Sequence, residues 1–223
     1  MTISRVFIAN RGEIAVRVIR ACKALSIDTV LGVSSADKET MGARLADRVV
    51  CIGPPRSSDS YLNREGIITT ALATECDAVH PGYGFLSEDA EFARLCQENG
   101  LIFVGPTPEN IRRMGNKLEA RALAKKFNVP LAEGSARLYS SDEALETAEQ
   151  VGYPILLKAA AGGGGRGIRV VDAPEKLKAA FEGASAEAAA AFGDGAMFME
   201  RYIGNARHVE VQILADNHGN VIH

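Results

Sequence analysis

The chain has 223 residues, of which 47% are hydrophobic and 24% are charged, enough for one large globular domain or about one and a half ordinary ones. Its 25 basic and 28 acidic residues give a net charge of −3, which excludes a globally basic nucleic-acid binder. No apolar run reaches the roughly 20 residues that span a bilayer, and no signal peptide precedes the first apolar segment, so we expect neither a membrane nor a nucleic-acid partner.

Strand-like and helix-like segments alternate over roughly residues 1–110. Apolar runs predict buried strands at residues 4–9, 29–33, 48–52, 78–80 and 101–104. Helical patterns separate them, at 64–73, at 88–97 and in a first helix with one face formed by Ile14, Val18, Cys22 and Leu25. The alternation predicts a doubly wound parallel-sheet α/β domain. Ligands meet such a sheet at the carboxyl ends of its strands, where residues 10–13 and 80–88 form loops.

A helix boundary is predicted near residue 115. Gly115 is a typical helix end, and Asn116 with Glu119 forms an N-cap pattern, so Lys117 falls in the first turn of a new helix that runs to about residue 127. Basic residues recur every four positions across this boundary, at Arg113, Lys117, Arg121 and Lys125. The predicted break and the acidic total favour a solvated face over a surface that binds nucleic acid.

A second α/β unit is predicted from residue 130 onward. Ser140 with Glu143 and Asp172 with Glu175 are N-cap patterns for two helices, of which the second is long, Ala-rich and weakened by Gly183. Strands are predicted at residues 153–159, 168–171, 197–203 and, from period-2 alternation, 208–214. A turn at 216–220 and a short strand from residue 221 predict a hairpin at the end of the chain.

The strongest chemical motif is a glycine-rich loop between two predicted strands, KAAAGGGGRGI at residues 158–168. Such glycines let backbone N–H groups wrap phosphate oxygens, and Lys158 can add a point charge. A dinucleotide fingerprint is disfavoured because a strand follows instead of a helix, and a Walker A loop because Ile168 stands in place of its lysine. The pattern predicts a glycine flap over a nucleotide; the alternative is a flexible surface loop without a ligand.

Six motifs occur in an order that resembles the signature series of the biotin carboxylases. They are IANRGEIA at 8–15, HPGYGFLSE at 80–88, MGNK at 114–117, the glycine loop, MERYI at 199–203 and RHVE at 207–210. The resemblance covers essentially the whole chain and implies an ATP-grasp enzyme. Its expected parts are a Rossmann-like, pre-ATP-grasp N-terminal domain at 1–115, a helical linker at 116–130, a lid subdomain at 131–205 and the start of the remaining ATP-grasp domain at 206–223.

Biotin carboxylases use MgATP and bicarbonate to form carboxyphosphate, from which carrier-bound biotin is carboxylated. The resemblance implies that two lysines bind the ATP phosphates, that the glycine flap closes over them, and that the MERYI segment frames the adenine. The implied ATP-binding residues are Lys117, Lys158, Gly162, Gly163, Gly164, Gly165, Arg166, Gly167, Ile168, Glu200, Arg201, Tyr202, Ile203 and His208.

Three residues are implied on or near the bicarbonate and biotin side: Tyr83, Glu88 and His208, of which the last lies beside either the nucleotide or the biotin. Each also has a plainer interpretation. Tyr83 can be a packed loop aromatic, Glu88 a charge that favours a helix N-terminus, and His208 a half-buried histidine on a strand.

The family's Mg²⁺-binding (or Mn²⁺-binding) glutamates and its bicarbonate-binding arginine fall beyond His223, so we expect no metal site within the chain and no activity of the chain alone. The expected partners are a biotin carboxyl carrier protein or domain, a carboxyltransferase subunit or domain, and a second copy in a homodimer. Two alternatives stay open: a non-catalytic module that binds nucleotide or pairs with a subunit, and another ATP-grasp ligase.

The cysteines are far apart in the sequence, at Cys22, Cys51, Cys76 and Cys96, and form no CxxC or Cys/His cluster. Free thiols are the expected state, and a cytoplasmic location follows as the expectation.

Overall fold

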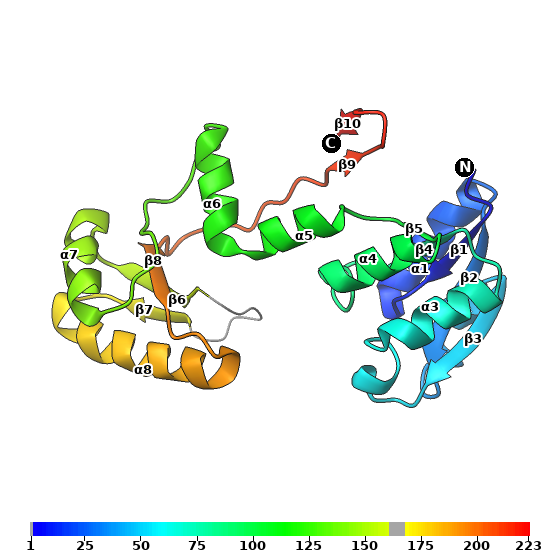
Figure 1. Ribbon diagram of the computed structural model, residues 1–223, viewed down its shortest axis with the longest axis horizontal. Helices are drawn as coiled ribbons and strands as arrows, with labels where there is room; N and C mark the ends of the chain where they lie inside the picture. Colours follow the sequence, from blue (N-terminus) through cyan, green and yellow to red (C-terminus); the bar gives the residue numbers. More distant parts are fainter. Residues whose placement is uncertain (1, 161–167) are drawn as a thin grey trace. The chain divides into compact units, whose positions relative to one another are not determined.

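The computed structural model describes residues 2–160 and 168–223, so the predicted flap residues 162–167 lie outside it. The chain divides into two compact units, Met1–Ala120 and Arg121–His223 (Figure 1). The finer division into a domain, a linker, a lid and a further segment remains a prediction.

The first unit is built on a parallel five-stranded sheet (Figure 1). Its strands are β1 (Arg5–Ile8), β2 (Asp28–Ser34), β3 (Arg48–Gly53), β4 (Ala78–His80) and β5 (Ile102–Phe103). They lie in the order β3-β2-β1-β4-β5, and every neighbouring pair is parallel. The chain runs outward from β1 to β3 and then restarts on the other side at β4, so the topological switch point lies between β1 and β4. The predicted doubly wound sheet is confirmed.

Helices cover both faces of this sheet. Ile8 of β1 packs in one core cluster with Ile19, whereas its neighbour Phe7 packs in another with Ile67 and Phe92. Successive strand residues point to opposite faces, so the two clusters lie on opposite sides of the sheet. Ile19 belongs to α1 (Gly12–Ala24), Ile67 to α3 (Arg64–Ala73) and Phe92 to α4 (Ala90–Glu98); the unit also contains α2 (Met41–Leu45), the 3-10 helix η1 (Ser57–Asp59) and α5 (Pro108–Gly115). Leu25 does not join the buried face of α1 as predicted, because the helix ends at Ala24 and leaves Leu25 exposed.

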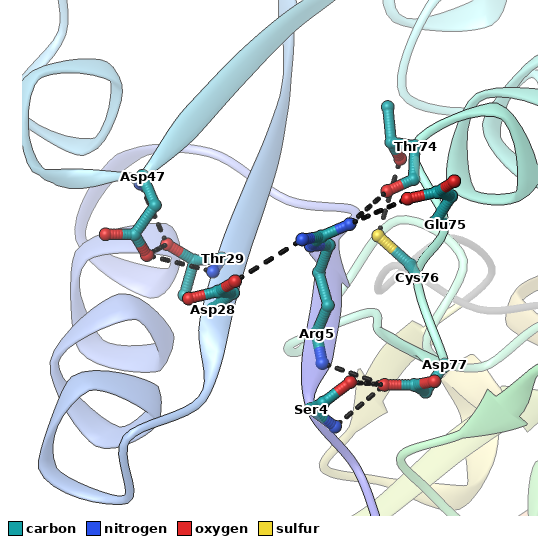
Figure 2. A network of polar contacts seen from close by, with 9 residues as sticks. All are labelled: Ser4, Arg5, Asp28, Thr29, Asp47, Thr74, Glu75, Cys76 and Asp77. Carbon is teal, nitrogen blue, oxygen red and sulfur yellow. Dashed lines mark hydrogen bonds and ion pairs between the residues drawn. The ribbon is translucent and has the colours of Figure 1, made fainter.

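Asp77, directly before β4, holds the amino end of the sheet (Figure 2). Its Oδ2 accepts hydrogen bonds from the Ser4 backbone N–H at 2.7 Å, the Ser4 hydroxyl at 2.6 Å and the Arg5 backbone N–H at 2.8 Å. These donors, the Ser4 hydroxyl foremost, hold the pKa of the Asp77 carboxyl below its ordinary value. The carboxylate thus ties the start of β1 to the start of β4.

Two helices meet at the boundary predicted near residue 115. α5 ends at Gly115, and α6 (Lys117–Lys126) begins two residues later. The Asn116 Oδ1 accepts hydrogen bonds from the backbone N–H groups of Leu118 and Glu119 at 3.1 and 3.3 Å. These bonds satisfy two of the free donors of the first turn and confirm the predicted cap.

The second unit contains a three-stranded antiparallel sheet with two helices packed on one face. The helices are α7 (Ser141–Val151) and α8 (Pro174–Phe192), and the strands β6 (Ile155–Ala159), β7 (Ile168–Val171) and β8 (Met197–Arg201) lie in the order β7-β6-β8. Ile155, Leu157 and Ala159 of β6 are buried among the helix side chains. Because strand residues alternate between faces, Lys158 points to the opposite, open face. The two strands predicted on either side of the glycine loop are confirmed as an antiparallel pair.

One prediction for the second unit is wrong, at the start of α8. Asp172 does not cap the helix; the N-cap is Ala173, which makes no side-chain capping bond, and Asp172 pairs with Lys176 at 2.9 Å instead. Gly183 does not interrupt the helix. The ion pair with Lys176, four residues later, gives the Asp172 carboxylate a partner. Its side chain therefore does not turn toward the backbone N–H groups of the first helical turn.

The strand predicted at residues 208–214 is wrong for residues 208–213, and only Leu214 lies in a strand. Residues 202–213 are exposed and form no strand, because period-2 alternation produces a strand only where a neighbouring strand supplies hydrogen bonds. The predicted terminal hairpin is confirmed by β9 (Leu214–Ala215) and β10 (Val221–Ile222), which pair antiparallel. Within residues 2–160 and 168–223, no helix combines the length and the apolar character that crossing a bilayer requires.

Candidate functional site

A buried amide joins the loops that follow β1 and β4, the two sides of the switch point. Asn10 is 1% exposed, and its Nδ2 donates to the carbonyls of Pro81 at 2.7 Å and Tyr83 at 2.9 Å. Gly82 lies against it at a φ of +68°, and a Cβ there would stand 2.4 Å from Cγ2 of Ile14. Only glycine fits this position. The two loops predicted to meet a ligand therefore lie side by side at the carboxyl edge of the sheet.

Tyr83 and Glu88, the residues expected on the bicarbonate and biotin side, both lie on the second of these loops. Tyr83 is 65% exposed, and its hydroxyl donates to Oε1 of Glu13 at 2.9 Å. Glu88 is exposed directly before Asp89, which caps α4 by accepting a hydrogen bond from the Phe92 N–H at 3.0 Å. The structure gives Tyr83 a partner at the start of α1 and places Glu88 one residue before the cap of α4.

An arginine stacked on two aromatic rings extends this edge. The Arg11 guanidinium lies 5.6 Å from the centroid of the Tyr61 ring and 5.7 Å from that of Phe85, and 3.9 Å from the Asp37 carboxylate. The Tyr61 hydroxyl donates to Asp37 at 2.7 Å, and burial raises the pKa of Tyr61 to about 12. No motif predicted this cluster, because its members come from four separate segments of the chain.

Three charged side chains meet on the face of the β7-β6-β8 sheet that α7 and α8 do not cover. We call these residues, Arg121, Lys158 and Glu200, the charged triad. Arg121 Nη1 lies 2.6 Å from Oε1 of Glu200, and the Lys158 ammonium pairs with the other carboxylate oxygen, Oε2. Lys158 and Glu200 come from the adjacent strands β6 and β8, and the Lys158 Nζ also lies 5.8 Å from the centroid of the Phe198 ring. The prediction that Arg121 belongs to a solvated face is wrong, since its side chain is only 18% exposed.

The charged triad carries one surplus positive charge. The side chains of Arg121, Lys158 and Glu200 are 18%, 21% and 17% exposed, so water screens their charges only in part. Two cations against one carboxylate in such surroundings favour an additional anion. Lys158 also pairs in register with Ile168, so the described ends of the glycine loop leave the sheet beside this charge. The arrangement suits the phosphate groups of a nucleotide.

The other predicted ATP-binding residues make no ion pair with the charged triad among the described residues, or lie outside those residues. Lys117 opens α6, Arg201 ends β8, and Tyr202 and Ile203 follow it on an exposed segment. The side chain of His208 is 79% exposed and pairs with Glu210 at 2.9 Å. The flap residues Gly162, Gly163, Gly164, Gly165, Arg166 and Gly167 lie outside the described residues.

The carboxylates of the described residues do not assemble a metal site. Over residues 2–160 and 168–223, no group of three or more His, Cys, Asp or Glu side chains is arranged to hold a metal ion. Glu200, the carboxylate nearest to Lys158, already has a cation on each oxygen.

Two family models cover nearly the whole chain. The model for "Biotin carboxylase, N-terminal domain" matches residues 2–111, and that for "Carbamoyl-phosphate synthase L chain, ATP binding domain" matches residues 116–223. Among curated proteins, the chain is 49% identical to a biotin carboxylase of Nostoc sp. and 50% identical to biotin carboxylase 1 of Bacillus subtilis. The matches include 100% and 99% of this chain but only 50% and 49% of those proteins.

Solved structures agree with these relatives. The chain matches a Campylobacter jejuni biotin carboxylase complexed with a β-γ-ATP compound with a TM-score of 0.91 and 46% identity, over 100% of this chain and 50% of that one. It matches the biotin carboxylase domain dimer of Hydrogenobacter thermophilus 2-oxoglutarate carboxylase, in complex with MgADP, ADP and bicarbonate, with a TM-score of 0.87 and 45% identity, over 100% and 49% of the two chains. The chain thus spans about half the length of the relatives it matches.

Proposed function

Because the chain belongs to the biotin carboxylase family, we propose that it provides the N-terminal domain and part of the nucleotide site of an ATP-dependent ligase that carboxylates biotin. In this reaction ATP and bicarbonate form carboxyphosphate, and the carboxyl group then passes to the ureido nitrogen of carrier-bound biotin. The observation that carries the proposal is the charged triad, whose surplus positive charge lies where the two ends of the glycine loop leave the sheet.

We propose that Lys158 and Lys117 bind the ATP phosphates, with residues 162–168 as the flap above them. The occupied carboxylate of Glu200 supports a change in its expected role: its oxygens hold Arg121 and Lys158, so its side chain neutralises charge and does not accept the adenine amine. The adenine is left to the backbone of Arg201, the last paired residue of β8, and of Tyr202 and Ile203, which follow it. Bound Mg²⁺ would offset phosphate charge during transfer, with its carboxylate ligands supplied from outside the described residues.

On the bicarbonate and biotin side we propose Tyr83 and Glu88, with His208 in a position near biotin or the nucleotide. The exposure of Tyr83 and its bond to Glu13 support a polar phenol that a ligand can reach. The proposed partners are a biotin carboxyl carrier, a carboxyltransferase and a second copy of the chain. The cytoplasm is the proposed location, and the free thiols of Cys22, Cys51, Cys76 and Cys96 agree with a reducing compartment.

The reaction is tested with a chimaera that joins this chain to the part of Bacillus subtilis biotin carboxylase 1 that it does not match. We expect ADP release that requires both bicarbonate and biotin. Lys158→Ala should lower this rate about tenfold or more, because one charge-assisted contact to phosphate is lost. Lys176→Ala, which removes an exposed lysine paired with Asp172, serves as the control and should leave the rate unchanged.

A second ATP-grasp activity is favoured by one observation, the match of residues 116–223 to the ATP-binding domain of carbamoyl-phosphate synthase. ADP release that depends on bicarbonate but proceeds equally without biotin would support that alternative and contradict the biotin carboxylase proposal.

A further inference from the structure

Arg121 is the member of the charged triad that lies outside the predicted nucleotide-binding motifs. We propose that Arg121 is a positioning residue, which fixes the ammonium group of Lys158 through the carboxylate of Glu200. The effect on phosphate binding rests on the proposed nucleotide function, whereas the contacts among the three side chains are observed without any ligand.

The Arg121 guanidinium is anchored at two points. Nη1 binds Oε1 of Glu200 at 2.6 Å, and Nη2 donates to the carbonyl of Ala132 at 2.9 Å. A planar guanidinium held at both ends of its fork cannot swing, so the Glu200 oxygen that it binds is fixed as well. Only Oε2 of Glu200 is left for Lys158, which sets the direction in which the lysine chain extends.

The surrounding backbone keeps room for this contact. Gly134 pairs with Glu200 in an antiparallel bridge. A Cβ on Gly134 would stand 2.6 Å from the carbonyl oxygen of Met199 and 2.8 Å from Nη2 of Arg121. A side chain at this position would displace the guanidinium, so the glycine, the arginine and the glutamate form one packed arrangement.

Arg121 also decides how much positive charge Lys158 can offer. Without it, Glu200 and Lys158 would form a neutral pair, and an incoming phosphate would have to compete with the carboxylate for the ammonium group. With it, Glu200 is shared between two cations, and one positive charge remains for the phosphate. Arg121 therefore acts on phosphate binding without touching the phosphate.

The first test follows the Lys158 side chain in the 223-residue chain without nucleotide. The ¹H–¹³C signal of the Lys158 Cε methylene group, assigned by its loss in Lys158→Arg, is compared among variants. In Arg121→Gln we expect the signal to move away from its wild-type position, because Lys158 no longer shares Glu200 with a second cation, and in Arg121→Lys to return toward wild type. Arg137→Gln, which breaks the Arg137–Asp194 ion pair elsewhere in the unit, should leave it unchanged. An unchanged Lys158 signal in folded Arg121→Gln would overturn the proposal; if that variant does not fold, Glu200→Gln provides the same comparison.

The second test compares ligands with and without phosphates by calorimetry. Arg121→Gln should weaken ATP binding about tenfold and leave adenosine binding unchanged, and it should add no further loss to Lys158→Gln. Equal losses for ATP and adenosine would indicate a general structural defect and contradict a positioning role. If the wild-type chain binds no ATP, the proposed nucleotide site in this chain is contradicted, whereas the Lys158 signal still decides the role of Arg121.

Discussion

The Tyr83 phenol donates a 2.9 Å hydrogen bond to the Glu13 carboxylate and so joins the loop after β4 to the first turn of α1, 70 positions earlier in the chain. The buried side-chain amide of Asn10 also ties the loop after β1 to the loop after β4, by donating to the backbone carbonyls of Pro81 and Tyr83. The Glu13 backbone N–H, and then the Tyr83 hydroxyl, hold the pKa of Glu13 below its ordinary value, while the hydrogen bond to Glu13 raises the pKa of Tyr83. An exposed phenol is thereby kept protonated and oriented at the edge where ligands of such sheets bind.

Replacing Tyr83 by Phe should raise the pKa of the Glu13 carboxyl toward its ordinary value, since the ionised form loses one hydrogen-bond donor. Carboxyl ¹³C NMR over an acidic pH series measures the change. Tyr139→Phe, at an equally exposed tyrosine, is the control and should leave the Glu13 titration unmoved. A Glu13 titration that is identical in Tyr83→Phe and wild type would show that the bond is not formed in solution.

Asp77→Ala should lower the free energy of unfolding by about 1–3 kcal/mol, because the donors of Ser4 and Arg5 lose their shared acceptor. The pKa of Asp77 is lower in the folded chain than its ordinary value of 3.8, so its contribution is present above that pH and is lost as the pH falls further. Urea unfolding at neutral pH and at pH 3 measures both effects. Asp28→Ala removes only an exposed ion pair with Arg5 and should lower the free energy of unfolding far less. Equal losses in the two variants would show that the Asp77 hydrogen bonds do not stabilise the fold.

Tyr61 makes the chain sensitive to alkali. Its pKa is raised from 10 to about 12 by burial, so the unfolded chain releases the phenolic proton at lower pH than the folded one. The stability that this group contributes is therefore complete below pH 10 and is lost as the pH rises toward about 12. Tyr61→Phe should be less stable at neutral pH, because Asp37 and the Ser34 N–H lose a partner, but should lose less stability on going to alkaline pH. Urea denaturation curves from neutral to alkaline pH measure the free energy of unfolding of each variant. Tyr139→Phe is the control and should lose as much stability at alkaline pH as wild type.

The parts of the fold that depend on local patterns could be predicted from the sequence. β4 and α3 have the predicted bounds, since a short buried run and a capped helix are specified by their own residues. Features that need a distant partner could not be predicted. The alternation at 208–213 forms no strand without a neighbouring strand. The basic pattern predicts a solvated Arg121, because its partner Glu200 is 79 residues away in the sequence. The same distance hid the charged triad, although Lys158 and Glu200 were each identified from their motifs.

Gly134 and Gly183 should respond to alanine in opposite directions. A Cβ at Gly134 would stand 2.6 Å from the Met199 carbonyl oxygen, so Gly134→Ala should destabilise the chain by about 1–3 kcal/mol and loosen the Arg121 contact. At Gly183, inside α8, the nearest atom would be Nη2 of Arg169 at 3.7 Å, an ordinary contact. Gly183→Ala should stabilise the helix by about 0.5–1 kcal/mol, because glycine loses more backbone freedom on folding than alanine. Urea unfolding of both variants measures the difference, and a neutral Gly134→Ala would mean that the backbone around Arg121 yields to a methyl group and does not fix the guanidinium.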